Sequence, residues 1–217
     1  MKIIQCVQGE AEWHQARVGR VTASEADALL TPEFNIRTGA GVQTYLYQKV
    51  AEAYAGKPMP GFSTFETEQG QMLEIDARRW YKFTYDELLL DAGFIVHDDG
   101  RCGCSPDALI GDYSGLEIKS PQPTNQVRYF LEGVVPKDYI VQVHFSMYVT
   151  GLKTWRFVSY ARSYPKLVLT VERDEKICAT IAEALAGFYA KMDAALERLG
   201  YSPNAGDERL REREETP

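Results

Sequence analysis

The sequence has few cysteines and no long apolar run. Its four cysteines among 217 residues are too few and too scattered for a disulfide framework, so we expect reduced thiols in a cytoplasmic protein. No stretch approaches the roughly 18 consecutive apolar residues of a membrane span, and no charged segment leads into an apolar one at the start. We therefore expect neither a membrane protein nor a secreted one.

Basic residues are also scarce relative to acidic ones. The chain contains 24 Lys and Arg against 31 Asp and Glu, a formal net charge of −7. Because nucleic-acid-binding domains usually carry a basic surplus, composition alone argues against that function. Internal repeats and Gly-, Pro- or Ser-rich linkers are missing too. We expect one domain over residues 1–200 and a charged tail over residues 201–217 that is a frayed helix or disordered.

Hydrophobic periodicity predicts helices at both ends and strands in the middle. Thr22-Ala23-Ser24-Glu25 has the form of a capping box and predicts a helix that starts near Thr22. Further predicted helices cover residues 41–55, 66–83, 138–149 and 174–199. One or two strands are predicted over residues 87–97, a short strand interrupted by proline over residues 104–110, and further strands over residues 115–119, 154–160 and 167–172. A helix between strands favours an α/β fold with a central mixed sheet flanked by helices.

Two acids and a lysine form the most informative pattern. Ser105-Pro106-Asp107 is followed, after nine residues, by Glu117-Ile118-Lys119. A strand places Glu117 and Lys119 on one face, roughly 6.5 to 7 Å apart, and a turn at residues 111–115 would bring Asp107 to them. Two hard oxygen ligands suit Mg²⁺, and a lysine beside them can orient a water or neutralise charge on phosphorus.

The same pattern also fits an ordinary hairpin with an exposed acid and base paired across it. The flanking residues favour a site over that alternative. Pro106 directly precedes the aspartate, and Gly115 opens the second strand. Glu74 on an upstream helix and Gln142 on a downstream helix are available to complete the site.

These segments resemble a known family. Asp107 with Glu117-Ile118-Lys119 is similar to the PD-(D/E)XK nuclease signature, and the surroundings resemble its phage lambda exonuclease branch, the YqaJ-type viral recombinase family. The resemblance covers about residues 8–200. The matching blocks, in chain order, are Trp13-His14-x-x-Arg17-x-Gly19, Thr22-Ala23-Ser24-Glu25, Gly70-x-x-x-Glu74-x-Asp76-Ala77-Arg78, Gly115-Leu116-Glu117-Ile118-Lys119 and Gln142-Val143 with Ser146-Met147-x-Val149-Thr150.

The resemblance implies a restriction-endonuclease-like core and a Mg²⁺-dependent 5′→3′ exonuclease. Such an enzyme digests one strand of duplex DNA from a 5′-phosphorylated end to mononucleotides by a two-metal mechanism, and leaves a 3′ single strand for recombination by single-strand annealing. The resemblance further implies a homotrimeric ring, a single-strand annealing protein as partner, and a phage or prophage gene in a bacterial host. Two alternatives remain: an endonuclease of the same superfamily in repair or restriction, and a non-catalytic DNA-end-binding module.

The resemblance also implies roles for the acids and their neighbours. Asp107, Glu117 and the backbone carbonyl of Ile118 would hold Mg²⁺, with Mn²⁺ as a substitute. Lys119 would act on the attacking water. Glu74 would support a second metal, directly or through water, unless it is an ordinary solvated helix residue. Gln142 would orient the site, unless its hydrogen bonding is only structural.

A pocket for the terminal 5′-phosphate is implied at Arg17, Ser24 and Thr22. A helix N-terminus, two hydroxyl groups and an arginine form an anion site on physical grounds as well. The alternatives are that the two hydroxyl residues only cap a helix and that Arg17 only makes a surface salt bridge. Arg20 and Trp13 are weaker candidates for DNA binding, and Trp13 fits a core or hinge position at least as well.

Other residues that often hold metals show no such pattern here. His14, His97 and His144 lie far apart without metal-ligand spacing. Some superfamily members bind an iron–sulfur cluster through one early and three late cysteines, but Cys178 is the one late cysteine here, so we expect no cluster. The acidity then gains a partial explanation, because acids that bind cations must be anionic. We expect an uneven surface, with bases turned toward DNA: Arg17, Arg20, Arg37, Arg78, Lys119 and Arg128.

Overall fold

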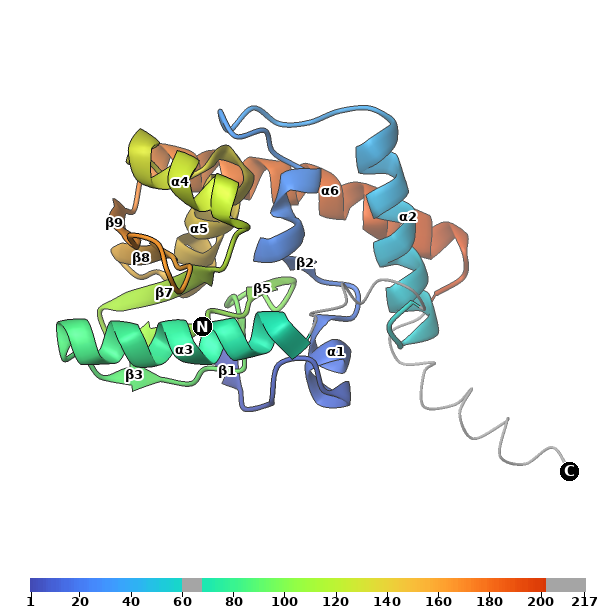
Figure 1. The fold of residues 1–217 in the computed structure, drawn as a ribbon. Helices are drawn as coiled ribbons and strands as arrows, with labels where there is room; N and C mark the ends of the chain where they lie inside the picture. The colour runs from blue at the N-terminus through green and yellow to red at the C-terminus, as the bar shows by residue number, and fades with distance from the viewer. Residues whose placement is uncertain (60–67, 202–217) are drawn as a thin grey trace, which may run out of the picture.

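Two mixed β-sheets and the helices packed on them make up the fold in the computed structural model, which describes residues 1–59 and 68–201 (Figure 1). The helices are α1 (Ala11–Arg17), the 3₁₀ helix η1 (Ala23–Ala28), α2 (Ala40–Ala55), α3 (Glu68–Tyr85), α4 (Pro123–Glu132), α5 (Lys137–Thr150) and α6 (Glu175–Arg198). The strands are β1 (Lys2–Ile4), β2 (Val21–Thr22), β3 (Leu89–Leu90), β4 (Phe94–Val96), β5 (Cys102–Cys104), β6 (Ala108–Ile110), β7 (Ser114–Lys119), β8 (Thr154–Ser159) and β9 (Leu167–Glu172). None of the helices in these described ranges is long and apolar enough to cross a bilayer.

The five-stranded sheet has the order β3-β6-β7-β8-β9, with β7 at its centre. β6 and β7 form an antiparallel hairpin, whereas β7 and β8 run parallel. A parallel pair needs a long crossover connection, and α4 and α5 supply it between these two strands. The sheet is therefore mixed, with its hairpin and its crossover meeting at β7.

The two faces of β7 are covered by different helices. Leu116 and Ile118 pack in one cluster with Ala77 and Tyr81 of α3. The opposite face meets α5, because the β7 residue Glu117 lies beside Phe157 of β8, which packs with that helix. Figure 1 shows α3 below β7, with α4 and α5 above it. The alternation predicted for this strand is confirmed, and it directs the acid and the lysine toward α5.

Gly115 allows β7 and β8 to lie close together beneath α5. It pairs with Trp155 across the parallel register. A Cβ atom at this position would lie 2.3 Å from carbon atoms of the fully buried Trp155 ring. The backbone of β7 thus needs glycine here because the indole occupies the space above it.

The second sheet has four strands in the order β1-β4-β5-β2. β2 runs parallel to β5, with Val21 beside Cys102 and Thr22 beside Gly103. The largest hydrophobic cluster joins this sheet to α2, α5 and α6 through residues such as Val21 and Phe145. This pairing places the segment that follows α1 next to the strand that leads to Ser105 and Asp107.

The predicted fold class is confirmed, since the structure is an α/β fold with mixed sheets flanked by helices. The strand predicted over residues 104–110 is interrupted at Pro106, as expected, but its two parts do not lie in one sheet. It divides into β5 and β6, which belong to different sheets, because Pro106 lacks an N–H and interrupts the strand. The short elements β1, α1, β2 and α4 were missed, since few residues give little periodicity. The predicted helix start at Glu66 and the tail beyond residue 201 lie outside the described residues.

Candidate active site

The β6–β7 hairpin brings Asp107 opposite Glu117. Asp107 directly precedes β6, and its N–H donates to the carbonyl of Leu116 over 3.1 Å. The N–H of Ile118 donates to Oδ2 of Asp107. The hairpin pairing that the spacing predicted is therefore present, and one carboxylate is anchored to the backbone of the strand that carries the other.

Glu117 is the centre of the polar contacts in the site. Its Oε1 accepts a 2.6 Å hydrogen bond from Nε2 of Gln142 and lies 2.7 Å from Nζ of Lys119. The Lys119 ammonium also lies 5.1 Å from the centre of the Tyr139 ring. Glu117 itself is 2% exposed, and its second oxygen, Oε2, is buried without a hydrogen-bond partner in the described part of the chain.

The pKa of Asp107 is strongly perturbed in this site. Burial raises the pKa of Asp107 well above its ordinary value, and the charges of Glu117 and Glu74 raise it further; Lys119 and the Ile118 N–H offset only part of this. Glu74 lies on α3 and is half-buried. Its charge acts on Asp107, so the structure brings this acid toward the pair. The site thus has an excess of negative charge in a buried place.

Lys119 stays protonated in this environment. Burial by itself lowers the pKa of its ammonium, but the charges of Glu117 and Asp107 outweigh burial and raise the pKa above the ordinary value. An ammonium with a raised pKa donates hydrogen bonds and stabilises negative charge, rather than accepting a proton. The residue is therefore suited to hold a water or a phosphate oxygen in place.

The residues present fit a divalent cation. An unsatisfied buried carboxylate oxygen costs about 1–3 kcal/mol or more, and a cation beside Glu117 Oε2 would remove this cost. The same cation would offset the repulsion that raises the pKa of Asp107. Carboxylate oxygens are the ligands that Mg²⁺ prefers. The donor set is therefore consistent with Mg²⁺ at these acids.

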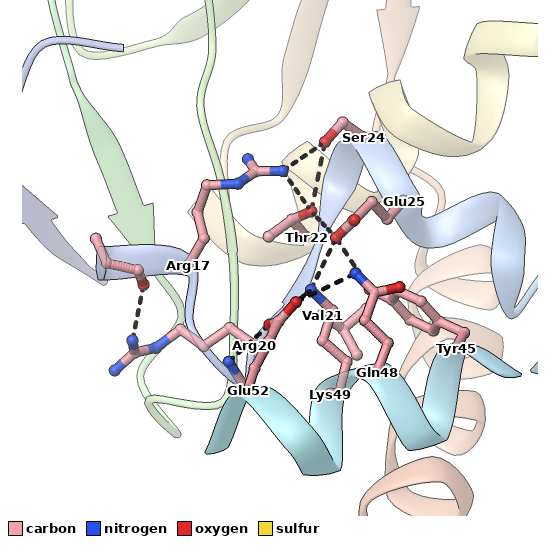
Figure 2. A network of polar contacts seen from close by, with 12 residues as sticks. Arg17, Arg20, Val21, Thr22, Ser24, Glu25, Tyr45, Gln48, Lys49 and Glu52 are labelled. Carbon is pink, nitrogen blue, oxygen red and sulfur yellow. Dashed lines mark hydrogen bonds and ion pairs between the residues drawn. The ribbon is translucent and has the colours of Figure 1, made fainter. Parts of the chain in front are cut away.

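Arg17 forms the centre of a second polar group, shown in Figure 2. Its Nη2 donates to Oγ1 of Thr22 and to Oγ of Ser24, each over 3.1 Å. The guanidinium lies 4.2 Å from the centre of the Trp13 ring. The three residues of the predicted phosphate pocket are thus in direct contact, with a cation and two hydroxyl groups together.

This Arg17 group is linked directly to the acid site. Nε1 of Trp13 donates to Oγ of Ser105 over 2.7 Å, although the two residues are 92 positions apart. Ser105 is two residues before Asp107. Trp13 thus lies between the arginine and the segment that carries the first acid. It is partly buried against Ala16 and the four-stranded sheet, as expected for a core or hinge aromatic.

The predicted capping box is wrong. The helix after Thr22 is a six-residue 3₁₀ helix, η1, and the Thr22 side chain makes no cap hydrogen bond. Instead, Oγ1 of Thr22 donates to Oε2 of Glu25 over 2.9 Å, because that carboxylate is held by the buried Lys49, 3.1 Å away. An anion in this pocket would rest on Arg17 and the hydroxyl groups, not on a helix N-terminus.

Arg20 is used differently from Arg17. Its Nη1 donates to the carbonyl of Ala16 over 2.7 Å, and its Nε donates to the carbonyl of Gly100 over 2.8 Å. Figure 2 shows its side chain turned away from Ser24 and Thr22. Arg20 therefore ties two chain segments together, and it does not join the Arg17 group.

Three residues of α2 that sequence reasoning missed support this region. Lys49 is 3% exposed and pairs with Glu25 and with Glu52, each at 3.1 Å. Glu52 also accepts a 3.1 Å hydrogen bond from the N–H of Gly19, and Tyr45 donates to Glu25 over 3.3 Å. The signal was available in the sequence, because Lys49 falls in the apolar stripe of this helix with an acid three residues later.

The fold and the acid–lysine site together define a nuclease domain of the PD-(D/E)XK type. The model of the YqaJ-like viral recombinase domain matches residues 12–153, so the chain belongs to that family. It is 36% identical over 70 residues to the ExoD protein of Escherichia coli (strain K12), covering 31% of this chain and 80% of that protein.

Solved structures agree with this assignment. An alkaline exonuclease from Laribacter hongkongensis, LHK-Exo, superposes with a TM-score of 0.77 at 28% identity, covering 88% of this chain and 96% of that one. Its complex with dAMP gives 0.78 at 30% identity over the same shares. A phage-related exonuclease from Haemophilus somnus 129PT shares the fold, with a TM-score of 0.59 at 11% identity, covering 83% and 96%.

Proposed function

We propose that the protein is a Mg²⁺-dependent 5′→3′ exonuclease for double-stranded DNA. It digests one strand from a 5′-phosphorylated end to mononucleotides and leaves a 3′ overhang for recombination by single-strand annealing. The observation that carries the proposal is the link from Arg17 through Trp13 to Ser105, beside Asp107. An anion pocket next to a buried acid cluster suits an enzyme that holds a terminal phosphate while it cuts the adjacent bond.

The acids and the lysine have complementary roles in this proposal. Asp107, Glu117, Glu74 and the carbonyl of Ile118 hold the metal, and Gln142 orients Glu117 through its hydrogen bond. Mg²⁺ in such a site supplies Lewis-acid stabilisation of the phosphate and activation of the attacking water. The protonated Lys119 orients that water or stabilises charge that develops on the phosphate oxygens.

Arg17 and Ser24 hold the 5′-phosphate, and the buried Thr22 hydroxyl, which donates to Glu25, accepts from Arg17 and fixes it. The guanidinium is already fixed by the Trp13 ring and by the two hydroxyl groups, so little side-chain freedom is lost when an anion binds. A phosphate can then accept hydrogen bonds from the guanidinium and from the exposed Ser24 hydroxyl. The pocket selects ends that carry a phosphate and sets which bond reaches the acids.

One digestion experiment tests the proposal. Linear duplex DNA with 5′-phosphate or 5′-hydroxyl ends, and closed circular plasmid, are incubated with the protein in Mg²⁺, in Mn²⁺ and in EDTA. We expect mononucleotides from the phosphorylated linear duplex with either metal, slower digestion of hydroxyl ends, and an intact circle. Cleavage of the circle would identify an endonuclease instead. Binding of ends without digestion in either metal would identify a non-catalytic end-binding module.

The family resemblance further supports a homotrimeric ring, a single-strand annealing protein as partner and a cytoplasmic location in a bacterial host. The mass of the protein in solution, measured by light scattering, tests the ring. A mass three times that of the chain is expected. A protein that is monomeric in solution and still digests DNA to mononucleotides would remove the trimer from the proposal and leave the nuclease assignment in place.

A further inference from the structure

A second group of metal-binding side chains lies at the turn between β4 and β5. His97, Asp99 and Cys102 each offer one ligand atom, and these atoms all lie within 4.8 Å of one another. The spacing of the three histidines did not indicate a metal site, because the partners of His97 are an aspartate and a cysteine. The group belongs to the four-stranded sheet, whereas Asp107 and Glu117 belong to the β6–β7 hairpin of the other sheet.

The hairpin geometry holds the three side chains together. The N–H of His97 donates to the carbonyl of Cys102 over 3.0 Å, so these two residues extend the ladder of β4 and β5 by one pair. The turn closes with a 2.9 Å hydrogen bond from the N–H of Gly100, at φ +76°, to the carbonyl of His97. Cross-strand neighbours of this kind have side chains in contact range.

Asp99 folds back over the same turn. Its Oδ1 accepts a 2.9 Å hydrogen bond from the N–H of Arg101 and lies 3.1 Å from Nδ1 of His97. The ring of His97 stacks on Tyr148, with ring centres 4.9 Å apart and planes 13° apart. The imidazole and the carboxylate are therefore held in position before any ion binds.

The neighbouring charges are directed elsewhere. Both terminal nitrogens of Arg101 bind the carboxylate of Asp193, at 2.9 and 2.5 Å, and its guanidinium stacks over Tyr189. Asp98 pairs with the amino group of Met1. Asp99 is thus the acid of this turn that remains directed at the histidine and the cysteine.

We propose that His97, Asp99 and Cys102 bind one transition-metal ion of the Zn²⁺ type. A nitrogen, an oxygen and a sulfur donor form a set typical of Zn²⁺ and Co²⁺, not of Mg²⁺, which prefers oxygen alone. Cys102 is fully buried, whereas the side chains of His97 and Asp99 are 25% and 43% exposed. The ion would therefore have the buried Cys102 sulfur on one side and the partly exposed His97 and Asp99 on the other.

A bound ion would join β4 to β5 at their turn. β5 ends two residues before Pro106 and pairs with β2, which carries Thr22. The proposal concerns stability and metal content of this hairpin, and it does not depend on the nuclease assignment.

Cobalt is the probe, because a thiolate bound to Co²⁺ gives a near-ultraviolet charge-transfer band. The full-length protein and its Asp107→Asn variant are titrated with CoCl₂ in the absence of Mg²⁺. We expect the band to saturate at one equivalent in both proteins and to disappear on addition of ZnCl₂. A band that is absent from the unaltered protein would overturn the proposal.

Four variants assign the ligands. Cys102→Ser should remove the band. His97→Gln and Asp99→Asn should weaken Co²⁺ binding by more than about 10-fold, since that is the smallest loss of affinity typical when a residue that only hydrogen-bonds to a metal ligand is removed. Cys104→Ser is the matched control, since this thiol is equally buried in β5 but lies outside the group. Circular dichroism confirms folding, and the partly exposed His97 keeps the test valid if Cys102→Ser unfolds. Unchanged Co²⁺ affinity in His97→Gln, or a band retained in a folded Cys102→Ser, would refute the site.

Discussion

Glu117 has two carboxylate oxygens in very different environments. Oε1 is bound by Gln142 and Lys119, whereas Oε2 is buried without a partner among the described residues. A protein seldom keeps such an atom unsatisfied, since the cost is about 1–3 kcal/mol or more. Asp107 and Glu74 add further negative charge to the site, and Lys119 offsets only part of it. The local chemistry thus favours a cation over any rearrangement of the protein donors.

The Asp107→Asn variant tests this electrostatic interpretation. The pKa of Asp107 is raised in the folded state, so the folded protein binds more protons than the unfolded chain, and stability falls as pH rises through the folded pKa. Without metal, the variant should have the higher melting temperature at alkaline pH. The variant should also no longer be stabilised by Mg²⁺. Its cleavage rate should fall by more than about 100-fold, because loss of a metal ligand costs more than loss of a residue that only hydrogen-bonds to a ligand. Thermal unfolding in EDTA and in Mg²⁺ measures the two effects on stability, and digestion of linear duplex DNA measures the cleavage rate. A Mg²⁺ response equal to that of the unaltered protein would contradict the assignment.

Gln142 is expected to act through Glu117. Gln142→Leu removes the 2.6 Å hydrogen bond that orients the carboxylate, so Mg²⁺ affinity or cleavage should fall by about 10- to 100-fold. Asp138→Asn, on the first turn of the same helix and exposed, is the control and should change neither. Cleavage rates over a range of Mg²⁺ concentrations distinguish weaker metal binding from a slower chemical step. Equal rates for Gln142→Leu and the control would give Gln142 a structural role only.

Among the elements, α2 acts as the support of the Arg17 pocket. Lys49 joins Glu25, which accepts from Thr22, to Glu52, which accepts from Gly19. Gly19 has φ +67°, and a Cβ there would lie 3.0 Å from Cβ of Ala53. The turn between Arg17 and Thr22 therefore has its shape because it packs directly against this helix.

Removal of the Lys49 charge should destabilise the whole region. Lys49→Met leaves two carboxylates close together without their cation, and breaking a buried ion pair costs about 3–5 kcal/mol. We expect a lower free energy of unfolding in urea, together with loss of the preference for 5′-phosphate ends. Lys57→Met, just beyond α2 and exposed, should change neither. An unchanged preference for 5′-phosphate ends in a destabilised Lys49→Met protein would show that the Arg17 pocket does not depend on Lys49.

α5 carries a buried histidine that should make stability depend on pH. Burial lowers the pKa of His144 from its ordinary value of 6.5, although the charge of Asp174 opposes this, and its Nδ1 is buried without a described partner. As the pH falls, the His144 side chain therefore takes up a proton in the unfolded chain at a higher pH than in the folded protein. Stability is full above pH 6.5 and decreases as the pH falls toward the folded pKa. His144→Leu should flatten this decrease in urea unfolding between neutral and mildly acidic pH, whereas His14→Gln should keep it.

For the molecule as a whole, the net charge of −7 does not describe the surface proposed to contact DNA. The charges of Glu117 and Glu74 raise the pKa of Asp107 at the site, and a divalent cation would offset this negative charge. Two of the bases predicted to face DNA have other contacts: Arg78 pairs with Asp91, and Arg20 binds backbone carbonyls. Arg17, in contrast, donates to the hydroxyl group of the exposed Ser24.

Salt dependence measures how many phosphate contacts are made. With the non-cleaving Asp107→Asn protein in Mg²⁺, affinity for a 5′-phosphorylated duplex end should fall linearly with the logarithm of salt concentration. Arg17→Ala should reduce that slope by about one unit, whereas Arg198→Ala, at the exposed end of α6, should not. Fluorescence anisotropy with labelled duplexes gives the slopes. Binding that is independent of salt would contradict an electrostatic contact with the phosphate backbone.

The sequence by itself determined the parts of this protein that depend on neighbouring residues. Alternation along Leu116-Glu117-Ile118-Lys119 predicted which side chains share a face, and the spacing to Asp107 predicted the hairpin. The limits of α2, α5, α6, β8 and β9 were also predicted to within about two residues. These predictions hold because strand alternation and helical periodicity follow from local backbone geometry.

Only the tertiary structure decided how distant segments meet. It joined Trp13 to Ser105 across 92 residues, buried Lys49 between two acids, and turned the expected capping box into a contact between Thr22 and Glu25. Each of these contacts depends on burial and on charges supplied by other elements, which outweigh a local preference of about 1 kcal/mol such as a helix cap.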